Sequence, residues 1–496
     1  MNKNLPRKVN TQGAIDRVQS KGESSTVLSV VIVATMAIIV TGLLLMMSAS
    51  FEEIGRLFTN NPLRIWALFA VSLVIVFTIY VFAKSDEKLS QNTHKYILLI
   101  YISMLVTIGL VIVAYKFIDP FVAPITLLSI IVTVFIGRRM AILCNGLFSV
   151  LLLIEYMLVN SDKGVMLSPE ILSGIVSMLV GYFVVFFLSK TSNRTRYLIT
   201  GVGIALLSTP LAFASALLLG DSSVELGARL IVALQSTAYS FVGNLLSVAI
   251  FLVALPIFES GFKMCTDFKL SEYCNFNVKL LRELAEYAPG TFNHSLMVGV
   301  LAESCAIAIG ENPQLARTCA YYHDVGKIKS PEFFAENQHA GENPHDDLIP
   351  EMSAKKITGH AIAGYEMLKK RGYPEELALV CLEHHGTMPV SYFYKKADKI
   401  SDGNAEVEKF SYAGPRPTSK ISAIIMLCDA CEAAARAAVH KVPLETIVGN
   451  IFDERLNYGQ FDECPITLAD LFKIKDTIIS VLDGIHHNRV SYVPKI

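Results

Sequence analysis

Long apolar runs in the first half of the chain constrain its fold more than any other sequence feature. A helix needs about 20 apolar residues to cross the hydrocarbon core of a bilayer, and residues 27–47 provide this length without a charge. Seven further runs lie at residues 65–83, 96–115, 121–136, 140–159, 171–188, 198–219 and 230–258. A hydrophobic content of 52% is too high for a soluble protein of 496 residues. The sequence therefore predicts a polytopic transmembrane bundle of about eight helices.

The distribution of basic residues predicts the orientation of this bundle. With the N-terminus inside, the inside segments contain 13 lysines and arginines, and the opposite loops contain five. Basic residues favour the cytoplasmic side, and eight crossings return the chain to the side from which it started. We therefore expect a cytoplasmic tail at residues 1–26, a transmembrane domain at 27–258 and a cytoplasmic C-terminal half. The net charge of -1 gives no indication of binding to a nucleic-acid polymer.

Glu155 is an ionisable residue within an apolar run. Charged groups at membrane depth are costly and often functional, so a role in binding a ligand or an ion is one interpretation. The other, which we favour, places Glu155 near the outer end of its helix, where the carboxylate reaches the membrane interface.

The C-terminal half has the pattern of amphipathic helices separated by Gly and Pro. Residues 259–287 are typical of a juxtamembrane helical linker, and residues 288–496 predict an all-helical domain. We expect helices at residues 301–309, ending at Gly310, and at 314–323, 353–371, 375–385, 419–438 and 468–483. Residues 331–350 and 395–418 show no clear pattern, and loops of this length in a compact domain are often functional.

Ten of the eleven histidines lie in this half, and several stand beside an aspartate or another histidine. His323 and Asp324 occur in the string YYHDVGK, and His384 and His385 precede a glycine. Asp429 lies in the apolar stretch IIMLCDA. Burying a carboxylate among such neighbours is costly unless it is paired or binds a metal.

Imidazoles and carboxylates in this pattern favour a centre with two metal ions. Adjacent residues of a helix point about 100° apart, so His323 and Asp324 address two neighbouring ions more readily than one. An aspartate has two oxygens and can bridge such ions. A ligand set without thiolates suits iron or manganese better than zinc. Two ions about 3.5 to 4 Å apart can activate water and clamp a phosphoryl group, which indicates phosphoester hydrolysis.

The chain resembles the HD superfamily of metal-dependent phosphohydrolases. The resemblance is carried by the order of His294, His323-Asp324, His360, His384-His385 and Asp429. The strings APGTFNHSLMV, YYHDVGKIKSPEFFAENQ, GENPHD, HHGT, YFYKKA and MLCDACEAAAR are similar to those of membrane-anchored 7TM-HD, or PgpH-type, cyclic di-AMP phosphodiesterases.

This resemblance implies hydrolysis of cyclic di-AMP to pApA, at a centre with two iron or manganese ions, in a multi-pass protein of the bacterial inner membrane. It implies that His294, His323, Asp324 and Asp429 hold one ion, and that Asp324, His360, His384 and His385 hold the other. Asp324 is then the bridging catalytic ligand. Lys327 is expected to steady phosphate charge, with an ordinary surface lysine as the alternative. Assembly of the protein as a homodimer is an open alternative.

Two other functions stay open as alternatives. The first is a different nucleotide phosphohydrolase of the HD superfamily. The second is a membrane receptor or transporter whose HD domain binds a nucleotide without hydrolysing it, although such a domain has no need of seven metal ligands. The chain also departs from the family pattern, because residues 48–64 replace the sizeable extracellular domain that usually follows the first helix.

Overall fold

The computed structural model describes residues 11–86, 89, 93–159, 168–188, 194–218, 224–262, 264–338, 343–437 and 442–487. The first ten residues of the expected N-terminal tail therefore lie outside the described part. The chain divides into two compact units, Met1–Met264 and Cys265–Ile496. The described residues form helices and no strand, with one isolated bridge between Pro389 and Ser411. The all-helical prediction is confirmed.

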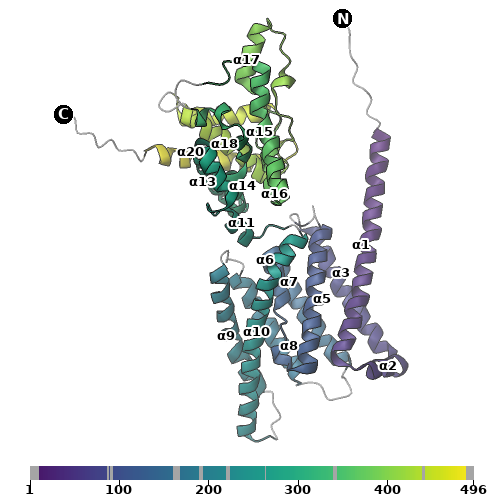
Figure 1. Cartoon of the computed structure of the whole chain (residues 1–496). Coiled ribbons are helices and arrows are strands. Elements are labelled where there is room, and N and C mark those ends of the chain that lie inside the picture. The colour runs from purple at the N-terminus through teal and green to yellow at the C-terminus, as the bar shows by residue number, and fades with distance from the viewer. Residues whose placement is uncertain are drawn as a thin grey trace, which may run out of the picture. The chain divides into compact units, whose positions relative to one another are not determined.

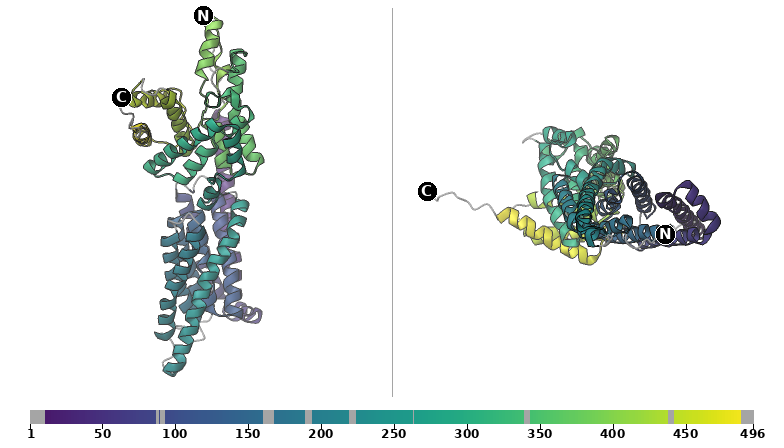
Figure 2. Two further views of the ribbon diagram at one scale, coloured as in Figure 1. Left: turned by 60° about the vertical axis from the view of Figure 1, so that its left-hand side comes forward. Right: turned by 90° about the horizontal axis from the view of Figure 1, so that it is seen from below.

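The first unit is a bundle of long apolar helices that run side by side (Figures 1 and 2). Its elements are α1 (Thr11–Ser48), α2 (Phe51–Asn60), α3 (Pro62–Ser85), α5 (Thr93–Phe117), η1 (Pro120–Val122), α6 (Leu127–Phe135), α7 (Arg138–Val159), α8 (Pro169–Leu188), α9 (Arg194–Leu218) and α10 (Leu226–Phe262). All of them except α2, η1 and α6 contain a stretch long and apolar enough to cross a membrane. The chain is a multi-pass membrane protein.

The apolar run at residues 121–136 is not the continuous helix that we expected. A short 3-10 turn, η1, is followed by non-helical backbone around Pro124, and only then does the nine-residue helix α6 begin. Irregular backbone is tolerated at membrane depth only where protein surrounds it. Residues 121–133 are buried accordingly. A broken helix therefore takes the place of one of the eight predicted helices.

Helix α10 packs against the broken segment formed by η1 and α6. The hydroxyl of Thr126 lies 3.1 Å from Asn244 Oδ1 and 3.1 Å from Ser247 Oγ. Gly243 permits this approach, because a Cβ atom there would lie 2.6 Å from the carbonyl oxygen of Val122. Two polar side chains and a glycine of α10 thus pack directly against the broken segment.

Glu155 lies in α7, and its side chain is fully buried inside the first unit. Glu155 lies near the end of α7, as we expected, but its side chain faces neighbouring helices and not the surface of the unit. The sequence position near the end of an apolar run could not reveal this, because burial depends on the neighbouring helices.

The second unit is a helical domain (Figure 1). Its elements are α11 (Asp267–Tyr273), α12 (Lys279–Tyr287), α13 (Pro289–Ile309), α14 (Pro313–Tyr322), η3 (Val325–Lys329), η4 (Pro331–Phe333), η5 (Ala335–Asn337), α15 (Pro350–Lys370), α16 (Glu375–Glu383), α17 (Ser391–Ile400), η6 (Val407–Phe410), α18 (Lys420–Ala437), α19 (Leu444–Asn457) and α20 (Leu468–His487). The expected end of α13 at Gly310 is confirmed, with a left-handed φ of 75°.

Helix α18 forms the centre of this unit. Every residue from Ile421 to Asp429 is buried, and the core around them includes apolar side chains of α13, α14 and α20. Helix α13 is itself apolar enough to resemble a membrane span, but its apolar side chains belong to this core. Helices α11 and α12, from the segment that we expected to be a linker, also contribute to it.

Candidate metal centre

All seven predicted metal ligands lie together in the second unit. His294 lies on α13, His323 and Asp324 lie between α14 and η3, His360 on α15, His384 and His385 directly after α16, and Asp429 on α18. They form two groups with the spacing of metal ligands. One group contains His294, His323, Asp324 and Asp429, and the other contains His360, His384 and His385. Within each group, the donor atoms all lie within 4.8 Å of one another.

The carboxylate of Asp324 lies between the two groups. Its Oδ2 atom is 3.3 Å from His323 Nε2 and 3.9 Å from His294 Nε2. Its Oδ1 atom is 3.1 Å from His360 Nε2 and 3.6 Å from His384 Nε2. Each oxygen therefore faces a different group, which is the arrangement that a bridging carboxylate requires.

Asp429 also faces residues of both groups. Its Oδ1 atom is 2.9 Å from His294 Nε2 and 3.8 Å from His323 Nε2. Its Oδ2 atom is 3.7 Å from His385 Nδ1. The apolar surroundings of Asp429 on α18 explain why its position is well defined, and the imidazoles supply the polar partners that a buried carboxylate needs.

Main-chain carbonyl groups fix the orientation of three imidazoles. The Nδ1 atoms of His323, His360 and His384 lie 2.7, 2.6 and 3.0 Å from the carbonyl oxygens of Ala320, Ile357 and Val380. A carbonyl oxygen can only accept, so each Nδ1 carries the proton and donates it. In the neutral ring, Nε2 then presents a lone pair to the centre.

Several atoms at the middle of the centre make no hydrogen bond of acceptable geometry. Within the described residues, His323 Nε2 and both carboxylate oxygens of Asp324 are buried without a hydrogen-bond partner of acceptable geometry. His360 Nε2 and His384 Nε2 approach each other to 3.2 Å. Lone pairs facing one another in a buried site repel unless a cation lies among them, so this donor set fits divalent metal ions.

His294 is oriented in a different way. Its Nδ1 atom pairs with the carboxylate of Glu432, which is itself buried and lies one turn after Asp429 on α18. A carboxylate that accepts the second N–H of a histidine fixes the ring and raises the basicity of the other nitrogen. Sequence reasoning missed Glu432, although its spacing of three residues from Asp429 places both side chains on one face of a helix.

The electrostatics differ between the two groups. Burial alone would lower the pKa of His323, but Asp324 and Asp429 raise it to about 10. Burial, together with neighbouring imidazoles, holds the pKa of His385 well below its usual value. The group near Asp429 therefore attracts cations through its carboxylates, whereas His385 offers a neutral lone pair.

Lys327 is not the surface residue that we considered as an alternative. Its side chain is 11% exposed, and Nζ lies 2.7 Å from Asp324 Oδ2 and 2.9 Å from Glu336 Oε1. Glu336 also accepts a hydrogen bond from the hydroxyl of Thr291, which lies on α13 three residues before His294. Lys327 thus balances the charge of Asp324 and connects it to η5.

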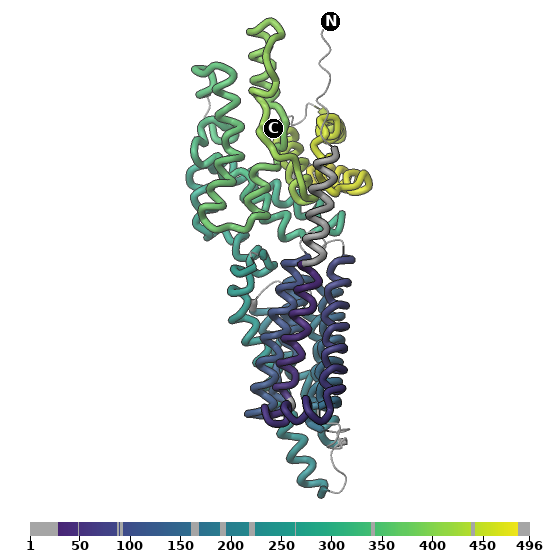
Figure 3. Tube along the Cα trace, turned by 90° about the vertical axis from the view of Figure 1, so that its right-hand side faces the viewer, coloured from purple at the N-terminus to yellow at the C-terminus, as the bar shows by residue number. Residues whose placement is uncertain are grey.

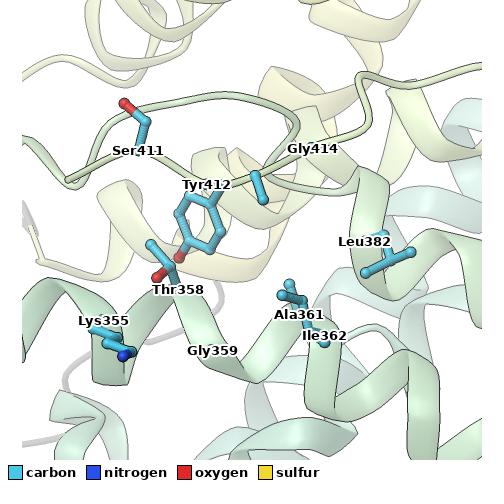
Figure 4. A pocket seen from close by; sticks show the side chains of 10 residues that line it. Lys355, Thr358, Gly359, Ala361, Ile362, Leu382, Ser411, Tyr412 and Gly414 are labelled. Carbon is cyan, nitrogen blue, oxygen red and sulfur yellow. The ribbon is translucent and has the colours of Figure 1, made fainter. Parts of the chain in front are cut away.

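A cavity of about 240 Å³ has Tyr412 among the lining residues that Figure 4 shows. Its walls come from α15, from Leu382 on α16 and from residues 411–414. Tyr412 lines this cavity, and its ring packs against His385 at a centroid distance of 4.3 Å and against His360 at 5.9 Å. Sequence reasoning missed Tyr412, because the stretch at residues 395–418 showed no recognisable pattern.

Both halves of the chain match known families. Residues 62–266 match the family described as "7TM receptor with intracellular HD hydrolase", and residues 291–434 match the HD domain. The chain therefore carries the two regions that this description names, a 7TM region followed by an HD domain. HD domains bind divalent metals, in agreement with the donor set found here.

The chain spans only about half of the length of the curated relatives that it matches. It is 33% identical over 435 residues to the cyclic-di-AMP phosphodiesterase PgpH of Bacillus subtilis, an alignment that covers 86% of this chain and 59% of the relative. It is 37% identical over 317 residues to PgpH of Listeria monocytogenes, covering 64% of this chain and 43% of the relative. The solved L. monocytogenes PgpH HD domain in complex with cyclic di-AMP is 41% identical, with 43% of this chain and 100% of that chain covered and a TM-score of 0.42.

Proposed function

We propose that this protein hydrolyses cyclic di-AMP to pApA at a centre with two divalent metal ions. The observation that carries the proposal is the Asp324 carboxylate, whose two oxygens face two separate groups of buried imidazoles. Two related 7TM-HD proteins are cyclic-di-AMP phosphodiesterases. The reaction adds one water molecule at phosphorus and breaks one bond between phosphorus and a ribose 3′-oxygen, which leaves a linear dinucleotide.

In this proposal, His294, His323, Asp324 and Asp429 hold one ion, and Asp324, His360, His384 and His385 hold the other. Nitrogen and oxygen donors without thiolates favour iron or manganese. Two divalent ions in such a centre supply Lewis acidity and activate water for attack on phosphorus.

The protein's own residues position these groups. Glu432 orients the ring of His294, and Lys327 holds the carboxylate of Asp324 in place from the opposite side. The positive charge of Lys327 also offsets negative charge of the substrate phosphate. Tyr412 presents an aromatic wall to the adjacent cavity, which is suited to a purine base because stacking on an aromatic face is favourable.

We further propose that the protein lies in the bacterial inner membrane with the HD domain in the cytoplasm. The excess of lysine and arginine on one side of the predicted spans supports this orientation. The cytoplasm is also where a soluble dinucleotide messenger is available as substrate. A homodimeric assembly stays a prediction.

Turnover by the full-length protein in detergent tests the proposed activity. We expect manganese or iron to support conversion of cyclic di-AMP to pApA, with slower turnover of cyclic di-GMP and of mononucleotides. The Asp324→Ala variant is expected to lose activity, because it removes the group shared by both ion sites. Substrate consumption and product identity are measured by chromatography, with bound metal measured by elemental analysis.

The matched control is Lys329→Ala, because Lys329 is more than half exposed and its only described ion pair is a 4.0 Å contact with Glu366. This variant should keep full activity. Preferential hydrolysis of mononucleotides would favour another type of HD phosphohydrolase. Tight binding of cyclic di-AMP without turnover would favour a receptor, and activity in Asp324→Ala would refute the proposed centre.

A further inference from the structure

Helix α2 connects α1 to α3 and differs from both in composition. It is ten residues long and begins with a capping box, in which Ser50 and Glu53 bond to each other's main-chain N–H groups. The capping box defines the start of the helix and satisfies two donors that would otherwise be free. Figure 3 shows α2 lying crosswise at one end of the long helices of the first unit.

The side chains of α2 separate cleanly into two faces. At 3.6 residues per turn, Phe51, Ile54, Leu57 and Phe58 share one side of the helix. The opposite side carries Glu52, Glu53, Arg56, Thr59 and Asn60. This pattern, on a helix of low overall hydrophobicity, is typical of helices that lie in the plane of a membrane surface.

Protein covers only part of the apolar face. Ile54 packs against the core of the first unit, and Leu57 is half-buried. Phe51 and Phe58, at the other edge of the same face, are 82% and 58% exposed. No residue of α2 is buried. The described part of the first unit therefore leaves these two phenyl rings uncovered. Unless lipid or another protein surface covers them, their exposure to water costs free energy.

The chain leads from these exposed rings directly into the exposed apolar start of a candidate membrane span. Leu63 and Trp66, in the first turns of α3, are exposed as well, and α3 is a candidate span from Pro62 to Ser85. Tryptophan is enriched where a span meets the membrane surface. Because the α3 surface faces lipid, the same lipid is the natural partner for the adjoining rings of α2.

We propose that α2 is an interfacial helix, with Phe51 and Phe58 inserted among lipid acyl chains just below the headgroups. Its charged residues, two glutamates and one arginine, then face water. This charge gives no attraction to anionic lipid, so insertion depends on the apolar rings and occurs equally in zwitterionic membranes. The helix anchors the connection between α1 and α3 at the bilayer surface.

Fluorescence quenching tests this placement, because Trp66 is the only tryptophan of the chain. The full-length protein is reconstituted in phosphatidylcholine vesicles, with acyl chains brominated either near the headgroup or near the methyl end. We expect stronger quenching of Trp66 by lipid brominated near the headgroup. Two further variants, both carrying Trp66→Phe, move the single tryptophan onto α2 as Phe58→Trp or, as the matched control, Thr59→Trp.

Phe58→Trp should be quenched by the shallow brominated lipid and protected from aqueous acrylamide, whereas Thr59→Trp should show the reverse. Addition of phosphatidylglycerol should change neither result. Similar acrylamide quenching of both variants would overturn the proposal by placing α2 in water. Protection of Phe58→Trp from both brominated lipid and acrylamide would also overturn the proposal, because another protein surface would then cover the helix.

Discussion

The proximity of the seven candidate ligands was predictable from the unusual chemistry of some of them and, for His294 and His360, from the resemblance to the HD superfamily. Asp429 follows a run of apolar residues, and His323-Asp324 and His384-His385 are adjacent pairs. Glu432 and Tyr412 gave no comparable signal. A glutamate on a helix and a tyrosine in a loop are common, and only the folded structure brings them to His294 and His385.

Replacement of Glu432 should weaken metal binding without unfolding the domain. Glu432→Ala removes the acceptor that orients His294, and losses of this kind typically lower metal affinity by about 10- to 100-fold. Glu432→Gln keeps an acceptor oxygen but removes the charge, so a smaller loss is expected. Titration of the metal-free protein with manganese, followed by calorimetry, measures both effects.

The exposed Glu445 on α19 provides the control. Glu445→Gln should bind manganese as tightly as the unchanged protein. Wild-type manganese affinity in Glu432→Ala, with His294 intact, would show that the carboxylate does not position the ligand.

At the level of helices, the sequence predicted long and regular elements well and irregular ones poorly. The apolar run at residues 121–136 indicated a span, but composition alone does not reveal that the backbone around Pro124 leaves the helical conformation. Helix α17 was missed because it is only ten residues long and more than half of it lies in the stretch at residues 395–418, although Phe393 and Ala397 form a buried face. Helix α19 was likewise missed.

We predict that a larger side chain at the contact between η3 and α15 disrupts the metal centre. A Cβ atom at Gly326 would lie 2.0 Å from the carbonyl oxygen of His360. Gly326→Ala must therefore push η3 away from α15, which separates Asp324 from His360. We expect a loss of about 1 to 3 kcal/mol in the free energy of unfolding and a large loss of phosphodiesterase activity.

Thermal unfolding and turnover of the same preparation measure these two losses. Gly449→Ala on α19 is the control, because its Cβ atom would meet only Lys475 Nζ at 3.5 Å. That substitution should leave both quantities unchanged or slightly raise stability. Normal activity in Gly326→Ala would mean that the η3–α15 spacing is not critical.

On the scale of the whole chain, the two units have separate cores and different sources of stability. The core of the first unit consists of membrane-spanning helices, whereas the core of the second surrounds α18. This division was predictable because charged residues are sparse in one half and dense in the other. The second unit also gathers two aspartates and five histidines, all buried except the partly exposed His385, around one centre, and bound cations would relieve the repulsion between their lone pairs.

Removal of metal should therefore destabilise the second unit selectively. A ligand present at about 1,000 times its dissociation constant stabilises the folded state by about 4 kcal/mol. We expect a chelator to lower the unfolding temperature of the second unit, and manganese to restore it, while unfolding of the first unit is unchanged. Differential scanning calorimetry of the full-length protein in detergent measures both transitions.

In Asp324→Ala, the chelator should have little further effect, because the shared ligand is already lost. If the chelator lowered the unfolding temperature of this variant as much as that of the unchanged protein, the chelated metal would have to bind elsewhere.

The Thr126 hydroxyl, which donates one hydrogen bond shared between Asn244 Oδ1 and Ser247 Oγ, has a mechanical consequence for the first unit. Sliding of α10 past the broken segment would break this contact in a medium that offers no replacement partner, which disfavours such movement. Since α10 continues to Phe262, a displacement of the segment around Pro124 would be passed along α10 toward the last residues of the first unit.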